Sequence, residues 1–409
     1  MATFTYVAKD VAGKRVKGSR EADDAATAQK MLQDQGLRVT DLKEVASAAN
    51  TKKSGGGGFM LGGVKLKDKS IFCRQFATMV NAGVSLVRCL DVLEQQTSSP
   101  RLKMITHQVR LDVEGGATLS RAMQEHPKAF DNLFLGLVRA GEVGGALDET
   151  LERLAVFLEK DMELRRKVKS AMTYPVIVMV AAVGIVGFLV YWILPQFAAM
   201  FKDTGVKQMP ATTQFLIDTS NFVRQHTVMT FVIIIVAYLV FKLFVSTKFG
   251  KLCYDWFKLK VLIFGKLNHQ VAISRFARTL GTLLSSGVPI LQAFDTVAGA
   301  IDNVIISRAI LSARDSIREG DSIARPLQKS KLFQPMVIHM VSIGEETGAL
   351  DAMLGKIADF YEAEVDAALA SLAATLEPVM IVILGFIVGF IVISMFMPLI
   401  AMIGGLSQG

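Results

Sequence analysis

Two short elements of the chain each carry a pair of carboxylates that could do chemistry. The paired side chains are Glu142 with Asp148, and Glu345 with Asp351. Two carboxylates near a turn can gather a hard cation or form an edge on which a partner docks. Because two acids alone provide too few ligands for a metal site, we predict no metal and no cofactor.

The glycine that precedes each acidic pair has a structural interpretation, which we favour. Gly141 and Gly344 are predicted to end one helix in a left-handed conformation. Asp148 and Asp351 then favour the positive end of the next helix. Docking or cation binding at these turns remains the functional alternative.

Other motifs that carry chemistry are lacking in the sequence. The glycine-rich stretch 57–63 resembles a phosphate loop, but Val64-Lys65-Leu66 follows it where Lys and then Ser or Thr would be required. The histidines do not have metal-ligand spacing; they are His107, His126, His226, His269 and His339. The cysteines are expected to be reduced packing residues; they are Cys73, Cys89 and Cys253. We therefore predict that the protein is not an enzyme.

The composition predicts a mixture of membrane spans and soluble domains. The 409 residues are 51% hydrophobic and 20% charged, and the mean hydropathy is +0.41. The formal charge of +8 could indicate nucleic acid, but the basic residues gather beside hydrophobic segments rather than among aromatic residues. Membrane lipids are therefore the expected partner, and nucleic acid is not.

Three segments are long enough to cross a hydrocarbon core about 30 Å thick. They are residues 176–195, 227–245 and 379–403. Basic residues precede the first segment and follow the second, so the positive-inside rule places loop 196–226 in the periplasm. Connectivity then predicts a cytoplasmic N-terminus and a periplasmic tail at residues 404–409.

The spans lack the groups that ion-coupled transport needs at membrane depth. They contain no Asp, Glu, His or Arg, so a permease remains conceivable only for an apolar substrate. Gly385 and Gly389 form a G-x-x-x-G that could let a neighbouring helix approach closely. Glycine that is merely tolerated in a lipid-facing helix explains this pattern equally well.

An internal repeat indicates that two large soluble regions are homologous. Residues 138–148 match residues 341–351, and Ala82-Gly-Val84 matches Ser286-Gly-Val288. The predicted helix boundaries in the first copy are Asp68 as a possible N-cap, Gly83 between helices, Ser99-Pro100 as N-cap and first helical residue, and Gly115-Gly116. We predict two six-helix cytoplasmic domains, residues 67–175 and 271–378, with a basic juxtamembrane connector at 246–270. The last helix of each domain should continue into a span.

A small module is predicted at residues 1–47. Alternating apolar residues and turn chemistry indicate strands near Phe4–Ala8, Val16 and Leu37–Leu42, with a helix from Asp23 or Asp24 to Gln35. The segment 48–66 is rich in glycine and is predicted to be a flexible linker. The predicted fold is thus an all-α membrane protein with three spans and two homologous bundles, preceded by a small α/β module.

Several motifs together resemble the type II secretion F/PilC family of inner-membrane platform proteins. The signature surrounds the entry to the first span, and both repeats contain Gly-Glu-x-x-Gly-Ala-Leu-Asp. The second repeat departs slightly, with Thr347 in place of Gly144 and Glu377 in place of Tyr174. The matching elements are Met1–Asp10, Gly36-Leu37, Arg74–Met79, Ala82-Gly-Val84, Lys167-Val168, Ala171-Met172, Tyr174-Pro175 and Ile193-Leu194-Pro195.

The resemblance implies a scaffold of the bacterial inner membrane for type IV pilus assembly. Expected partners are hexameric assembly and retraction ATPases, pilin subunits, other inner-membrane pilus proteins and a second copy of the chain in a homodimer. The type II secretion platform, which would drive a pseudopilus, is the alternative from the same family. The candidate docking or coupling residues are Gly83, Gly141, Glu142, Gly145, Leu147, Asp148, Tyr174, Pro175, Gly287, Gly344, Glu345, Gly348, Leu350, Asp351 and Pro378.

Overall fold

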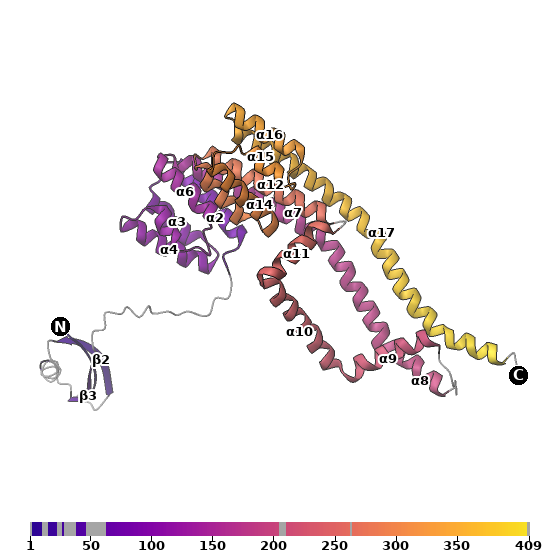
Figure 1. Cartoon of the computed structure of the whole chain (residues 1–409). Helices are drawn as coiled ribbons and strands as arrows, with labels where there is room; N and C mark the ends of the chain where they lie inside the picture. The colour runs from indigo at the N-terminus through magenta and orange to yellow at the C-terminus, as the bar shows by residue number, and fades with distance from the viewer. Residues whose placement is uncertain are drawn as a thin grey trace. The chain divides into compact units, whose positions relative to one another are not determined.

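The computed structural model describes residues 2–9, 15–22, 27, 38–45, 63–203, 210–261 and 264–406. The chain divides into two compact units, Met1–Leu61 and Gly62–Gly409 (Figure 1). Most of the predicted linker, and the predicted tail beyond residue 406, lie outside the described residues. Helix α2 begins at Leu66, so the last position of the predicted linker already belongs to a helix.

The first unit contains a three-stranded antiparallel sheet in the order β2-β1-β3. Its strands are β1 (Ala2–Lys9), β2 (Arg15–Ala22) and β3 (Arg38–Val45). These strands contain or overlap the three predicted ones. Strand β1 is central and pairs with β2 on one side and with β3 on the other. The helix predicted after Asp23 lies outside the described residues, apart from Thr27, which is helical.

The first helical domain begins at Leu66 and ends in a long helix. Its elements are α2 (Leu66–Asn81), α3 (Leu86–Gln96), α4 (Pro100–Glu114), α5 (Leu119–Gln124), α6 (Asn132–Gly144) and α7 (Leu147–Phe188). The predicted start of α4 is confirmed, because the Ser99 side chain accepts a hydrogen bond from Leu102 N–H and Pro100 is the first helical residue. The prediction that Asp68 is an N-cap is wrong. Lys65 holds that position, and Asp68 lies in the first turn.

The second helical domain repeats this plan. Its elements are α12 (Phe264–Ser285), α13 (Ile290–Ala300), α14 (Val304–Arg318), α15 (Ala324–Lys329), α16 (Pro335–Thr347) and α17 (Leu350–Leu406). Helices α3 and α13 both have 11 residues, α4 and α14 have 15, α5 and α15 have 6, and α6 and α16 have 13. The two six-helix bundles predicted from the repeat are therefore confirmed within residues 63–203 and 264–406.

Each long helix buries a stripe of apolar side chains in its domain. Leu151 and Leu154 of α7 and Leu354 and Ile357 of α17 are fully buried, and Tyr361 is 1% exposed. One cluster of buried side chains includes residues from both domains. Burial of each large side chain stabilises the fold by about 1.5 to 3 kcal/mol.

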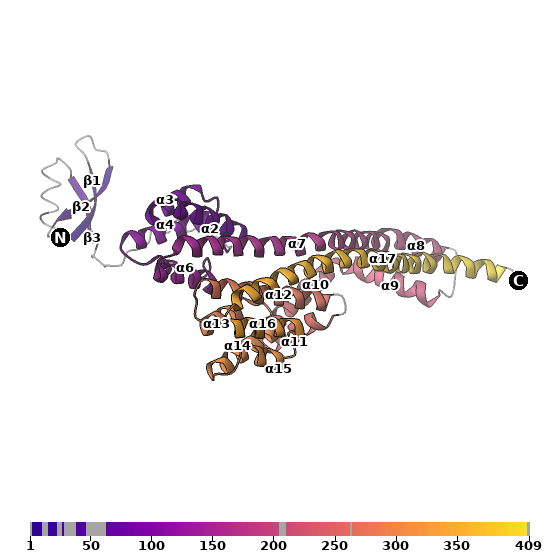
Figure 2. The same ribbon diagram turned by 90° about the horizontal axis from the view of Figure 1, so that it is seen from above.

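Among the described residues, three helical stretches are long and apolar enough to cross a membrane. The first continues from α7 through a π-helical segment (Leu189–Ile193) into α8 (Leu194–Asp203). The second is α10 (Thr227–Ser246), and the third is the C-terminal part of α17. Each contains a predicted span, and Figure 2 shows α7 and α17 running side by side out of the helical domains.

Helix α9 (Ala211–Gln225) lies between the first and second spans in the chain, and it contacts both the first and the third span. The Ser220 hydroxyl donates a hydrogen bond to the carbonyl of Val190 at 2.5 Å, and the Thr213 hydroxyl donates to the carbonyl of Ser394 at 2.5 Å. Leu216 is buried in a small cluster with Ile391. Val190 lies in the π-helical segment, and its carbonyl thus has a hydrogen-bond partner on α9.

Candidate docking and coupling site

The turn between α6 and α7 is built around the first predicted acidic element. Gly145 ends α6 in the left-handed conformation with φ of 70°, which glycine adopts without steric cost. The N–H groups of Gly145 and Ala146 both donate to the carbonyl of Gly141, the second at 3.0 Å, so the turn provides partners for a carbonyl in the last turn of α6. Glu142 lies in the last turn of α6.

Glu142 contacts the beginning of α5. Its carboxylate accepts hydrogen bonds from the N–H groups of Leu119 at 2.5 Å and Ser120 at 3.0 Å. These N–H groups belong to the first turn of α5, where they have no partner within the helix and carry partial positive charge. Glu142 therefore fixes α5 against the end of α6.

The second domain repeats this contact. The Glu345 carboxylate accepts from Ile323 N–H at 3.0 and 2.9 Å and from Ala324 N–H at 3.4 Å, at the beginning of α15. Gly348 is left-handed, with φ of 71°. Within the described ranges, no three His, Cys, Asp or Glu side chains gather as metal ligands. The oxygens of both glutamates are instead engaged by backbone N–H groups.

The prediction that Gly141 and Gly344 are left-handed is wrong. Both lie inside helices, α6 and α16, and both are buried. A Cβ on Gly141 would overlap the hydroxyl of Thr150 and lie 3.0 Å from the Cα of Leu147, and one on Gly344 would lie 2.9 Å from the Cα of Leu350. These glycines therefore allow two consecutive helices to pack closely.

The other predicted residues of this element take the positions expected of them. Asp148 and Asp351 lie in the first turns of α7 and α17, where a carboxylate is favourable, and both are exposed. Leu147 is half-buried, and Leu350 is buried in the core. Beside Glu142, the Val143 side chain is 85% exposed.

Gly83 and Gly287 occupy equivalent turns after the first helix of each domain. Their φ values are 79° and 78°. Val84 N–H donates to the carbonyl of Met79, and Val288 N–H to the carbonyl of Leu283, both at 3.0 Å. This geometry is the Schellman motif, which requires a left-handed residue.

The two prolines at the span entries lie inside unbroken helices. Pro175 is buried in α7, whereas Pro378 is exposed in α17. Tyr174, which precedes the first, is 51% exposed. A proline lacks the N–H that would bond the preceding turn, so each position weakens the helix locally without ending it. The predicted continuity of domain and span is confirmed.

The structure reveals an ion-pair cluster that the sequence analysis did not single out. Arg74 on α2 donates to both carboxylate oxygens of Glu159 on α7, each at 2.7 Å, and it also pairs with Glu152. These hydrogen bonds, chiefly that with Glu159, raise the pKa of Arg74. A bidentate guanidinium–carboxylate pair fixes orientation as well as distance.

The second domain has the equivalent cluster. Arg278 on α12 donates to Glu362 at 3.0 and 2.7 Å and to Asp359 at 2.7 Å. In the internal repeat, Arg74 corresponds to Arg278 and Glu159 to Glu362. The repeat could therefore have indicated that these residues form an equivalent pair in each domain. In each domain the cluster ties the first helix to the helix that enters the membrane.

The two long helices also contact each other before they reach the spans. Lys167 Nζ of α7 lies 2.7 Å from Asp366 Oδ2 of α17. Beside this pair, Leu164 packs with Val365 and Leu369 in a buried apolar cluster. The two long helices are therefore in contact outside the spans.

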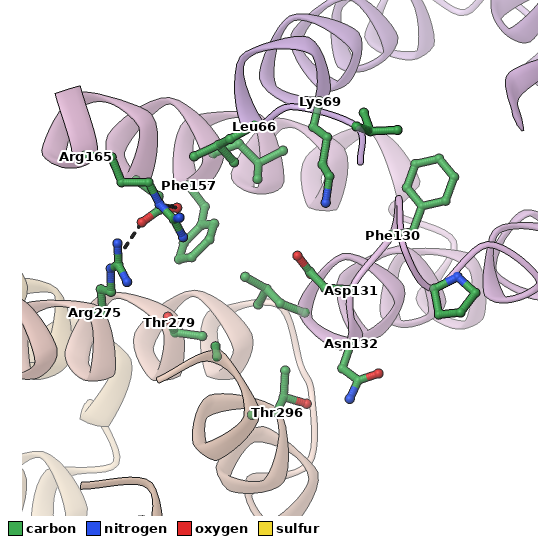
Figure 3. A pocket seen from close by; sticks show the side chains of 17 residues that line it. Leu66, Lys69, Phe130, Asp131, Asn132, Phe157, Arg165, Arg275, Thr279 and Thr296 are labelled. Atoms are coloured by element: carbon green, nitrogen blue, oxygen red, sulfur yellow. Dashed lines mark hydrogen bonds and ion pairs between the residues drawn. The ribbon is translucent and has the colours of Figure 1, made fainter. Parts of the chain in front are cut away.

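A cavity of about 570 Å³ lies where the two helical domains meet. On one wall, Asp161 of α7 forms ion pairs with Arg165 of the same helix and with Arg275 of α12. Figure 3 labels the two arginines, which lie close together. Asp131, on another wall, accepts a hydrogen bond from Phe134 N–H as the N-cap of α6. The acidic groups of the cavity are thus engaged by the protein itself.

Gly385 and Gly389 lie on the third span. A Cβ on either glycine would meet nothing within 4 Å. Their surface is therefore open to a neighbouring helix or to lipid, and packing through G-x-x-x-G stays a prediction.

The geometry defines a multi-pass membrane protein with a duplicated helical domain whose last helices enter the membrane. The family model "Type II secretion system (T2SS), protein F" matches residues 72–195 and 276–398, and the N-terminal domain model of the same family matches residues 1–43. The chain belongs to this family.

Curated relatives cover nearly the whole chain. Type IV pilus assembly protein PilC of Thermus thermophilus is 45% identical over 100% of both chains, and that of Myxococcus xanthus is 41% identical over 99% of this chain and 96% of its own. Type II secretion system protein F of Vibrio cholerae is 34% identical over 98% of both.

Proposed function

We propose that this protein is the inner-membrane platform of a type IV pilus assembly machine. It couples a cytoplasmic hexameric ATPase to the insertion or removal of pilin subunits at the base of the fibre. The full-length similarity to relatives named for type IV pilus assembly supports this function. The ATP chemistry belongs to the partner, and this chain is a scaffold rather than an enzyme.

One structural observation carries the proposal: each helical domain is continuous with a span. Helix α7 runs from its domain core into the first span, which continues through the π-helical segment into α8, and α17 runs from its domain core through the third span. The arginine clusters tie the rest of each domain to these helices, and the Lys167–Asp366 pair connects the helices to each other. Motion applied to a domain is transmitted along its helix without an intervening loop.

The α6–α7 turn is the proposed docking edge for the ATPase. It combines the exposed Val143 with the exposed Asp148, whereas the second turn has Glu346 where the first has Val143. The two turns should therefore bind their partners differently.

The orientation and the assembly belong to the same proposal. The domains lie in the cytoplasm with the N-terminus, and the segment that contains α9 lies in the periplasm with the C-terminus. The chain acts as a homodimer and contacts pilins and other inner-membrane pilus proteins beside the spans.

A deletion strain tests the function. Cells that lack the gene should display no surface pili, and expression of the full-length chain should restore them. Pili at normal number in the deletion strain would refute the proposal. Purified full-length protein, free of contaminating ATPase, should not hydrolyse ATP by itself, because the chain lacks a phosphate loop with its lysine.

A type II secretion platform is the second candidate. The Vibrio cholerae relative named type II secretion system protein F covers the chain as fully as the pilus relatives, although at lower identity. Loss of protein secretion with intact pili in the deletion strain would favour this candidate.

A further inference from the structure

Helix α11 (Lys248–Lys260) directly follows the second span and carries an exposed apolar face. The side chains of Phe249, Trp256 and Phe257 are 71%, 53% and 60% exposed. Cys253 lies on the same face and is also exposed, contrary to the prediction that it packs in a core. The spacing of these residues places them along one side of the helix.

The opposite side of α11 is fixed to the second helical domain. Asp255 is 3% exposed, and its carboxylate accepts a hydrogen bond from Val304 N–H at 2.8 Å, at the start of α14. Asn268 donates to the carbonyl of Lys258 at 3.3 Å. The exposed aromatic face is therefore held outward by a rigid attachment.

The exposed charge of α11 is entirely positive. Its acid, Asp255, is turned into the domain, and its basic residues are Lys248, Lys251, Lys258 and Lys260. The ammonium groups of Lys258 and Lys260 lie 4.5 and 4.9 Å from the ring centroids of Tyr254 and Trp256. Aromatic rings interleaved with lysines are typical of a helix that lies at a membrane surface.

A tight corner sets where this helix leaves the second span. The Thr247 hydroxyl accepts from Gly250 N–H at 3.0 Å, and a Cβ on Gly250 would overlap the carbonyl of Phe244. The corner encloses an apolar groove of about 670 Å³, lined by residues of α10 and α11 that include Phe241, Phe244, Trp256 and Phe257. The apolar surface of the span thus continues onto α11.

We propose that α11 lies in the plane of the bilayer surface, with its aromatic face among the acyl chains and its lysines on anionic phospholipid headgroups. The helix thereby seats the second domain against the membrane beside the second span. The inference requires only that α10 crosses the bilayer, so it stands or falls independently of the proposed role in pilus assembly.

Trp256 is a direct probe, because the chain has two tryptophans and the other, Trp192, lies in the first span. The full-length Trp192→Phe variant is placed in nanodiscs that hold one copy each. The discs contain phosphatidylcholine with phosphatidylglycerol, and brominated lipids carry bromine at shallow or deep positions. Tryptophan emission should be blue-shifted, resistant to aqueous iodide and quenched more by shallow than by deep bromines.

Strong iodide quenching with no bromine quenching would overturn the proposal. Protection from iodide that arises only in discs with two copies would also overturn it, because a second copy would then cover the face. A complementary variant, Trp256→Phe, reports Trp192 alone and gives the quenching of a tryptophan within a span for comparison.

The charge component is tested by replacing Lys248, Lys251, Lys258 and Lys260 with glutamine in the Trp192→Phe background. Each lysine near an anionic surface strengthens association by about fivefold. In the parent variant, Trp256 should be better protected from iodide in discs with phosphatidylglycerol than in discs of phosphatidylcholine alone. The glutamine variant should lose this difference. The matched control, Lys103→Gln with Lys128→Gln on the first domain, should keep it. An unchanged lipid preference in the α11 variant would contradict the role of the lysines.

Discussion

Glu345 accepts hydrogen bonds from the backbone N–H of Ile323 at 3.0 and 2.9 Å, and it thereby joins the end of one helix to the beginning of another. Glu142 makes the equivalent contact with Leu119. The duplicated acidic element therefore includes a carboxylate that stabilises a short helix. Its companion aspartate remains exposed and available to a partner.

Replacing Glu142 with glutamine should loosen α5. The amide keeps an acceptor oxygen but loses the charge that favours a helix N-terminus, which should cost about 1 kcal/mol. Amide hydrogen exchange of the full-length protein should then be about fivefold faster across residues 119–124. The control is Glu125→Gln, at the exposed end of the same helix. Equal exchange in the two variants would contradict the assigned role.

A methyl group at Gly141 should be poorly tolerated. Gly141→Ala places its Cβ against Thr150 and Leu147, so we expect the free energy of unfolding to fall by about 2 kcal/mol. Gly144→Ala is the matched control, because the same helix leaves that position open and alanine is the better helix former. Gly145→Ala should cost about 1 kcal/mol through its left-handed conformation.

Thr150→Ala should recover part of the loss in Gly141→Ala, since it removes the hydroxyl but leaves the backbone of Leu147 in place. Thermal unfolding of the full-length proteins in detergent measures all these variants. An unfolding temperature of Gly141→Ala equal to that of Gly144→Ala would show that close packing is not required. In cells, Gly141→Val should insert into the membrane yet fail to support pili.

The arginine cluster should couple α2 to α7. A double-mutant cycle with Arg74→Gln and Glu159→Gln should give an interaction free energy of about 1 kcal/mol, because the pair is bidentate but only partly buried. Arg74→Lys should behave like Arg74→Gln, since an ammonium cannot make the paired contacts. Strictly additive effects on unfolding would show that the pair contributes nothing.

The proposed orientation predicts which surfaces are reached from outside the cell. Gln214 is exposed on α9, so Gln214→Cys in a Cys253→Ser background should react with a membrane-impermeant maleimide once the outer membrane is permeabilised. Lys103→Cys, exposed on the first helical domain, should react only after the inner membrane is opened. Protection of Gln214→Cys with labelling of Lys103→Cys would reverse the orientation.

Local patterns were sufficient to predict much of the fold. The spans follow from uninterrupted apolar segments, and the start of α4 follows from Ser99 and Pro100 because capping depends on neighbours in sequence. The repeat predicted two equivalent bundles. Asp68 was misassigned because any acidic residue in the first turn produces a similar signal.

The site was less predictable because its contacts are tertiary. Gly141 and Gly145 are both glycines near one turn, and the sequence does not reveal that Gly145 is left-handed while Gly141 packs against Thr150 and Leu147. The pairing of Arg74 with Glu159 joins residues far apart in sequence. The hydrogen bond from Ser220 to the carbonyl of Val190 falls in a π-helical turn, and the sequence analysis predicted neither.

The central claim is that α7 transmits motion from the first domain to the first span as one continuous helix. Two glycines inserted between Lys169 and Ser170 would interrupt this helix while leaving the domain and the apolar span unchanged in sequence. The same insertion among the glycines at residues 55–58 is the control. We predict normal membrane abundance and ATPase co-purification for both proteins, with surface pili only in the control. Normal piliation with the α7 insertion would contradict the account.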